Sequence, residues 1–204
     1  MNKLGIFGGT FDPPHIGHQI LAAEAVAQLK LDRVLWVLTP DPPHKQGLKF
    51  APLAARRAMV TAVIANDTTF EFSSVDIDRK GPHYAYDTVR LIAAQYPETE
   101  ISYLIGEDSL FDLPSWHRPH DFVGVCDEFG VMRRAGRPLQ YEQLEDTFPG
   151  IRAKIRYLDT PLIQISSSLI RERIAADDQF RYFLPEGVYR EICERNLYAG
   201  TQAR

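Results

Sequence analysis

The chain has 204 residues, of which 45% are hydrophobic and 25% are charged, and its formal net charge is −4. This composition excludes a largely disordered protein and favours one domain over residues 1–204. Because the net charge is negative, the chain offers no general attraction for nucleic acid or anionic membranes, and any anion site must be local.

Short apolar runs alternate with longer segments of helical period, which is typical of parallel strands joined by helical crossovers. The pattern predicts the α/β class, with a doubly wound, mostly parallel sheet flanked by helices and a small C-terminal helical portion. The expected strands are 3–7, 33–38, 70–75, 101–105, 129–132 and 154–157. The expected helices are 17–30, 52–65, 84–96, 139–147, 167–176 and 185–196.

The cysteines and the N-terminus indicate the compartment. Cys126 and Cys193 are too few and too far apart for a disulfide framework or a thiolate zinc site. The first residues lack the apolar core of a signal peptide, and no run approaches membrane-spanning length. We therefore expect a cytoplasmic protein without a membrane partner.

The first expected strand is followed by two adjacent glycines, Gly8 and Gly9, and then by two histidines, His15 and His18. Glycines at this turn let the backbone approach a phosphate closely, and the following helix N-terminus favours negative charge. Their spacing matches neither a dinucleotide fingerprint nor a P-loop. The histidines, three residues apart around Gly17, can both donate to phosphate oxygens, and Gly17 leaves room for the ligand. An ordinary turn with solvated or capping histidines is the alternative.

Three serines, Ser166 to Ser168, precede another expected helix near the end of the chain. Their hydroxyls and the amides of that helix start can bind phosphate oxygens, and Arg171 can add a charge-assisted contact one turn later. A plain helix cap would use the same residues.

The segment 7–18, with its literal His-Ile-Gly-His, resembles the signature of a Rossmann-like nucleotidyltransferase superfamily that shares His-x-Gly-His with class I aminoacyl-tRNA synthetases. The resemblance implies that His15, His18 and Arg171 are catalytic and that the two histidines hold the ATP phosphates. It assigns the ATP pocket to Gly8, Gly9, Thr10 and Phe11. The segment 165–171 resembles the superfamily's Ile-Ser-Ser-Thr-x-Ile-Arg motif, which implies that Ser167 and Ser168 contact the triphosphate.

Four intervening segments resemble bacterial nicotinate mononucleotide adenylyltransferases: Pro-Pro-His-Lys at 42–45, Arg-Lys-Gly-Pro-His-Tyr-Ala at 79–85, Gly-Glu-Asp-Ser at 106–109 and Leu-Pro-Ser-Trp-His at 113–117. The resemblance implies mononucleotide binding by His44, Lys45, Tyr84, Ala85 and Trp116, with the indole stacked on the pyridine ring. It implies ATP contacts from Gly106 and Asp108 and, in a turn at 132–137, from Arg134. His83 and Ala85 depart from the serine and threonine of the family pattern. The closing segment, which ends in Leu197 and Tyr198, resembles a family helix whose role is mainly packing.

The resemblance implies transfer of the adenylyl group of ATP to nicotinate mononucleotide, giving deamido-NAD and pyrophosphate in NAD biosynthesis. The attacking phosphate oxygen is already anionic, so positioning and charge neutralisation can supply most of the acceleration. Magnesium is expected to arrive with ATP, since it binds substrate phosphates with few protein ligands. Two alternatives stay open: nicotinamide mononucleotide as the preferred substrate, and a non-catalytic nucleotide-sensing module. The oligomeric state is not predicted.

Overall fold

The computed structural model describes residues 2–42, 47, 49–133 and 141–200, except for the side chain of Tyr141. One sheet has the strand order β3-β2-β1-β4-β5-β6, and all five pairings are parallel. The strands are β1 Asn2–Gly9, β2 Arg33–Leu38, β3 Phe70–Ser73, β4 Thr99–Gly106, β5 Glu128–Met132 and β6 Ile155–Leu158. This order places the topological switch point between β1 and β4. The predicted Rossmann-like α/β fold is confirmed.

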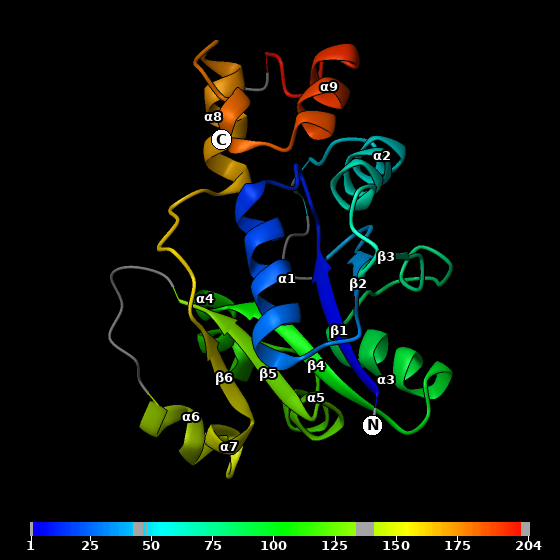
Figure 1. Cartoon of the computed structure of the whole chain (residues 1–204), viewed down its shortest axis with the longest axis vertical. Coiled ribbons are helices and arrows are strands. Elements are labelled where there is room, and N and C mark those ends of the chain that lie inside the picture. Colours follow the sequence, from blue (N-terminus) through cyan, green and yellow to red (C-terminus); the bar gives the residue numbers. More distant parts are fainter. Residues whose placement is uncertain (1, 43–46, 48, 134–140, 201–204) are drawn as a thin grey trace.

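Helices cover both faces of the sheet (Figure 1). They are α1 Ile16–Leu29, α2 Leu53–Ile64, α3 Ala85–Gln95, α4 Glu107–Phe111, α5 Pro119–Val125, α6 Tyr141–Thr147, α7 Ile151–Lys154, α8 Ser167–Ala175 and α9 Glu186–Glu194, with 3₁₀ turns η2 Leu113–Ser115 and η3 Arg181–Phe183. The apolar residues of α1, α2, α8 and α9 form one core, and those of α3 to α7 form the other. The C-terminal helices α8 and α9 lie beyond the carboxyl end of β1.

Strand β2 shows why an apolar run becomes a central parallel strand. Its residues from Val34 to Leu38 are all buried, and they alternate between the two cores. Val34 and Trp36 face one core, whereas Leu35 and Val37 face the other. A strand covered on both faces requires a continuous apolar sequence, and this requirement makes such strands visible in the sequence.

Only β2 has the predicted bounds; the other five strands differ from the prediction by one or two residues at an end, and in two of them the prediction included residues that lie outside the strand. Strand β3 ends at Ser73 rather than Val75, because the chain turns there: Ser74 Oγ donates to Asp78 Oδ2 at 2.6 Å. Strand β6 begins at Ile155, because Lys154 ends α7 and its Nζ donates to two carbonyl oxygens of the α5 region at 2.8 Å. Of the predicted helix 139–147, the first two residues lie outside the described part, and α6 covers the rest.

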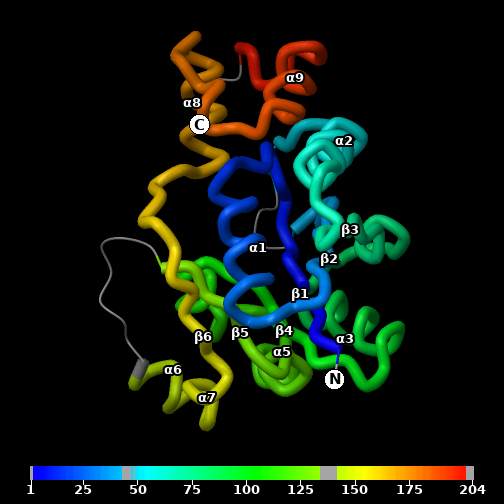
Figure 2. The backbone as a smooth tube through the Cα atoms, viewed as in Figure 1, coloured from blue at the N-terminus to red at the C-terminus, as the bar shows by residue number. Residues whose placement is uncertain are grey.

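The segment between β6 and α8 carries the chain along the length of α1. Figure 2 shows it running up beside α1. Gln28 on α1 fixes its lower end, since Nε2 donates to Asp159 O at 3.0 Å and Oε1 accepts from Asp159 N–H at 2.9 Å. This path brings the start of α8 to the start of α1.

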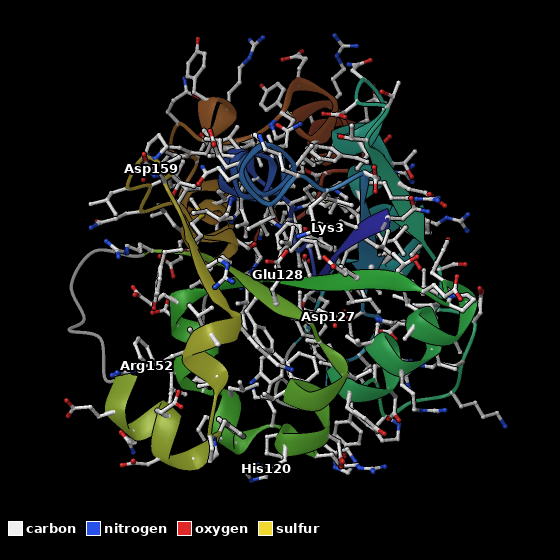
Figure 3. The ribbon with its side chains drawn as sticks, turned by 60° about the horizontal axis from the view of Figure 1, so that its bottom comes forward. Lys3, His120, Asp127, Glu128, Arg152 and Asp159 are labelled. Atoms are coloured by element: carbon white, nitrogen blue, oxygen red, sulfur yellow. The ribbon has the colours of Figure 1, made fainter. Side chains whose placement is uncertain are left out.

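The amino end of the sheet carries a charged cluster, which Figure 3 views from below. Lys3 Nζ on β1 lies 3.1 Å from Glu100 on β4 and 3.6 Å from Glu128 on β5. The hydrogen bond that the Lys3 ammonium donates to Glu100 is the main reason that the pKa of Lys3 is raised. Because these side chains are partly exposed, we assign them a minor part in stability. No described helix is long and apolar enough to cross a membrane.

Candidate active site

The loop between β1 and α1 is polar and buried. Thr10 is 9% exposed, Asp12 is 3% exposed and His15 is 4% exposed. The loop leaves the carboxyl end of β1 beside β4, at the position where open parallel sheets bind ligands. Polar groups kept away from water at such a position need partners, and those partners define the site.

At both predicted glycine positions, neighbouring side chains leave no room for a Cβ atom. A Cβ on Gly8 would lie 2.9 Å from the hydroxyl oxygen of Tyr103 on β4. A Cβ on Gly9 would lie 3.0 Å from the ring of Phe11, which is buried and adopts a φ of 47°. The glycine pair therefore lets Tyr103 and Phe11 pack at the strand end.

His15 and His18 stand together at the start of α1. Their rings stack with centroids 3.7 Å apart at 25°. His18 Nδ1 accepts a hydrogen bond from the backbone N–H of His15 at 3.0 Å, so the neutral His18 ring carries its proton on Nε2. The Nε2–H group of His18 is a suitable hydrogen-bond donor for a phosphate oxygen. A Cβ on Gly17 would lie 3.1 Å from the His15 ring, so this ring takes the room that Gly17 provides.

Helix α8 is bound directly to the loop after β1. Ser167 Oγ donates to Pro13 O at 2.9 Å across 154 residues, and Arg171 Nη1 donates to Asp12 O at 2.7 Å. Ser168 Oγ accepts from Arg171 Nη2 at 3.3 Å and keeps its own proton to donate. The Ser167 hydroxyl is already engaged, so in this arrangement only its backbone N–H can serve a phosphate. The two predicted phosphate-binding segments thus meet at one place.

The Asp12 carboxylate contacts three different segments of the chain. Its Oδ1 accepts from Ala51 N–H at 3.0 Å and from the Tyr198 hydroxyl at 2.8 Å, while Arg171 Nη1 lies 3.8 Å from its Oδ2. Burial raises the pKa of Tyr198, and the charge of Asp12 acts in the same direction. The sequence predicted only packing for the C-terminal segment, but the hydroxyl of Tyr198 reaches the loop after β1.

Arg56 on α2 was missed by the sequence analysis. This buried guanidinium donates to Thr10 O at 3.0 Å, Thr39 O at 2.9 Å, Pro40 O at 2.8 Å and Ala51 O at 3.1 Å. Burial lowers its pKa. Arg56 therefore ties the loop after β1 to both ends of the connection between β2 and α2. An arginine in a helical segment is usually solvated, and no sequence signal separates it from its exposed neighbour Arg57.

A second buried carboxylate was also missed. Asp76 is 1% exposed, and its Oδ1 accepts from Thr88 Oγ1 at 2.7 Å and from Arg79 Nε at 3.0 Å. Its Oδ2 accepts from Thr39 Oγ1 at 3.2 Å. The ring of His83, the residue that departs from the family serine, lies between Asp41 O at 3.2 Å and Arg79 O at 3.3 Å. Together these contacts fix the segment that leads into α3.

The residues predicted for the mononucleotide come from two neighbouring segments. Tyr84 precedes α3, Ala85 begins it, and the Tyr84 ring stacks on His117 with centroids 3.9 Å apart at 21°. Trp116 is half-buried, and its indole packs against Phe122 at 5.3 Å. The structure thus brings Tyr84 beside the segment that contains Trp116, and here the indole contacts an aromatic core.

The remaining predicted ATP residues lie at the end of β4 or outside the described residues. Gly106 ends β4, and Asp108 is the half-buried second residue of α4. The preceding Glu107, which the sequence analysis did not single out, is buried. His44, Lys45 and Arg134 lie outside the described residues. Within the described ranges, no group of three or more His, Cys, Asp or Glu side chains could hold a metal ion.

Comparisons with known proteins agree with this architecture. Residues 6–173 match the cytidylyltransferase-like family. A probable nicotinate-nucleotide adenylyltransferase of Thermomicrobium roseum is 39% identical over 203 residues, covering 100% of this chain and 94% of that protein. The nicotinate-nucleotide adenylyltransferase of Bacillus subtilis is 33% identical over 198 residues, covering 97% of this chain and 99% of that protein.

Among solved structures, the nicotinic acid mononucleotide adenylyltransferase of Plasmodium falciparum complexed with NaAD aligns with a TM-score of 0.78. The alignment covers 97% of this chain and 98% of that one at 19% identity, so it supports the fold. The same enzyme complexed with APC aligns with a TM-score of 0.76 at 18% identity, over 97% of this chain and 98% of that one. The chain therefore belongs to the cytidylyltransferase-like family and, within it, to the nicotinate-nucleotide adenylyltransferases.

Proposed function

We propose that this enzyme transfers the adenylyl group of ATP to nicotinate mononucleotide, giving deamido-NAD and pyrophosphate. The observation that carries the proposal is the contact between the starts of α1 and α8, which gathers His15, His18, Ser168 and Arg171 at the carboxyl end of β1. The names of the curated relatives support the choice of substrates. A location in the cytoplasm stays a prediction.

In the proposed reaction, a phosphate oxygen of the mononucleotide attacks the α-phosphorus of ATP in line with the departing pyrophosphate. A new P–O bond forms, and the bond from the α-phosphorus to the bridging oxygen breaks with its electron pair leaving on pyrophosphate. No proton must move, because the attacking oxygen is already anionic. The protein therefore has to position the groups and neutralise charge.

The donors at the site suit that task. His18 can offer its Nε2 proton, and Arg171 keeps N–H groups beyond those bound to Asp12 O and Ser168 Oγ. The N-termini of α1 and α8 add a favourable potential for anions. This donor set is cationic and rich in N–H groups, so it fits phosphates better than a metal ion. We accordingly propose that magnesium enters bound to ATP, where it would neutralise charge on the leaving pyrophosphate.

Pyrophosphate release by the purified enzyme tests the proposal. ATP and magnesium are supplied with either nicotinate mononucleotide or nicotinamide mononucleotide, and we expect release with the acid to be faster. Faster release with the amide would overturn the proposal that nicotinate mononucleotide is the substrate. Release without magnesium would overturn the proposed role of the metal. Measurable ATP binding without release on either substrate would favour the nucleotide-sensing module.

Two histidine variants test the role of His18 in turnover. We expect His18→Ala to abolish turnover without unfolding the protein, since it removes the Nε2 donor. His120→Ala is the matched control, because His120 is exposed on α5 at the opposite end of the molecule (Figure 3). Normal turnover in His18→Ala would refute the assigned role.

A further inference from the structure

Tyr198 joins the end of the described chain to the loop after β1. The residue follows α9, and its side chain is 9% exposed and belongs to the core built by α1, α2, α8 and α9. Its hydroxyl donates to Asp12 Oδ1 at 2.8 Å, across 186 residues. Packing alone would be served by phenylalanine, so the hydroxyl points to a polar role.

The two oxygens of the Asp12 carboxylate are used unequally. Oδ1 accepts hydrogen bonds from Ala51 N–H and the Tyr198 hydroxyl. Oδ2 is buried and, within the described part of the chain, accepts none. Arg171 Nη1 lies 3.8 Å from Oδ2, beyond hydrogen-bonding distance, and donates to the backbone oxygen of Asp12 at 2.7 Å. The carboxylate is therefore held next to Arg171 without a direct hydrogen bond to it.

This arrangement preserves the donors of Arg171. A guanidinium has five N–H groups, and Arg171 donates one to Asp12 O and one to Ser168 Oγ. Its side chain is 34% exposed, so the remaining N–H groups can reach a ligand. If the Asp12 carboxylate could rotate, it would form a bidentate pair with this guanidinium, because that geometry is favoured between the two groups. Such a pair would occupy the N–H donors that phosphates require.

We propose that Tyr198 is a positioning residue for nucleotide binding: its hydroxyl, together with Ala51 N–H, anchors Asp12 Oδ1 and so keeps Arg171 available to the triphosphate of ATP. The inference rests on the proposed function for the identity of the nucleotide. It concerns ATP and not the mononucleotide, because Tyr198 contacts the loop that meets α8, whereas Tyr84 and Trp116 lie on other segments.

The test compares Tyr198→Phe with the parent enzyme in steady-state pyrophosphate release, with each substrate varied in turn. We expect the KM for ATP to rise roughly three- to tenfold, part of the full effect of a hydrogen bond to a charged group. The KM for the mononucleotide should change by less than about twofold. Because KM does not depend on the fraction of active enzyme, partial unfolding cannot imitate this result. Tyr189→Phe on α9 is the control, since its half-buried ring packs on Phe180, and we expect it to change neither KM.

The proposal is overturned if the KM for ATP in Tyr198→Phe stays within about twofold of the parent value, or if both KM values rise equally. Calorimetric titration of the two proteins with ATP and magnesium separates this failure from a failure of the proposed function. A parent enzyme that binds ATP but releases no pyrophosphate refutes the proposed function, while the ratio of the two ATP affinities still tests Tyr198. Equal affinities in that titration overturn the role of Tyr198.

Discussion

Replacing Arg56 by lysine removes at least half of the hydrogen bonds with which this residue joins three segments around the site. The guanidinium donates to four carbonyl oxygens, on Thr10, Thr39, Pro40 and Ala51. A lysine keeps the positive charge, but its donors sit on one nitrogen and cannot span carbonyls placed around a planar fork. We expect about two or three of these hydrogen bonds to be lost.

The magnitude follows from the burial of the carbonyl groups. Each hydrogen bond lost at a buried acceptor costs about 1 to 1.5 kcal/mol, so Arg56→Lys should lower the free energy of unfolding by roughly 2 to 4 kcal/mol. In a chain of this size each kcal/mol lowers Tm by about 2 to 4 °C, which gives an expected drop of roughly 4 to 16 °C.

Thermal unfolding at neutral pH, followed by circular dichroism, measures this effect. Arg57→Lys is the matched control, because Arg57 is exposed and its guanidinium lies 5.3 Å from the ring centroid of Phe72. We expect the control to change stability by less than about 0.5 kcal/mol. Equal Tm values for the two variants would refute the assignment of a structural role to the hydrogen bonds of Arg56.

Three further changes test other contacts. Gly8→Ala should destabilise the fold by about 1 to 3 kcal/mol, because the new Cβ would lie 2.9 Å from the Tyr103 hydroxyl, and adding Tyr103→Phe should restore part of the loss in urea unfolding. Gly17→Ala should lower kcat by at least about tenfold by displacing the His15 ring, while Tm holds or rises, since alanine favours a helix. Above pH 10.0, the ordinary pKa of tyrosine, the parent should lose stability relative to Tyr198→Phe by up to about 1.4 kcal/mol per pH unit, because burial raises the pKa of Tyr198 in the folded state only.

Each of these expectations has a result that would contradict it. For Gly8→Ala, it is a double variant no more stable than the single one. For Gly17→Ala, the expectation is contradicted if the variant keeps full turnover, or if it loses both turnover and stability. For Tyr198, the free energies of unfolding of the parent and of Tyr198→Phe would be compared by urea unfolding from pH 8.0 to above pH 10.0. The expectation is contradicted if the difference between the two proteins changes by less than about 0.3 kcal/mol over this range.

The parts of the site that the sequence reveals are those whose residues are adjacent in the chain. His15, His18 and the serines before α8 form short strings with a recognisable spacing, so their approach to one another could be expected. Arg56 and Tyr198 could not be found in this way. Their partners are backbone carbonyls and one carboxylate in distant segments, and no periodicity or local motif records such a contact.

The same distinction applies to the fold. The strands were predictable because burial on both faces makes each of them an apolar run. The short elements α4, η2, α5 and α7 have between three and seven residues and bury only one or two side chains each. An element of that length does not complete enough turns to show a helical period, so its sequence resembles a loop.

The contact between α8 and the loop after β1 also has a consequence for the order of events during synthesis. All six strands precede residue 159 in the chain, whereas Ser167, Arg171 and Tyr198 follow it. At translation rates of about 5 to 20 residues per second, Ser167 leaves the ribosome about 0.5 to 2 seconds after the sheet, and Tyr198 about 2 to 8 seconds after it. The nascent chain therefore passes through a stage in which the loop after β1 is bound by Arg56 and Ala51 but lacks its contacts with α8 and Tyr198. A nascent chain whose residues through β6 have left the ribosome, with α8 still inside the exit tunnel, should bind ATP weakly, and the enzyme acquires its site only as its last helices emerge.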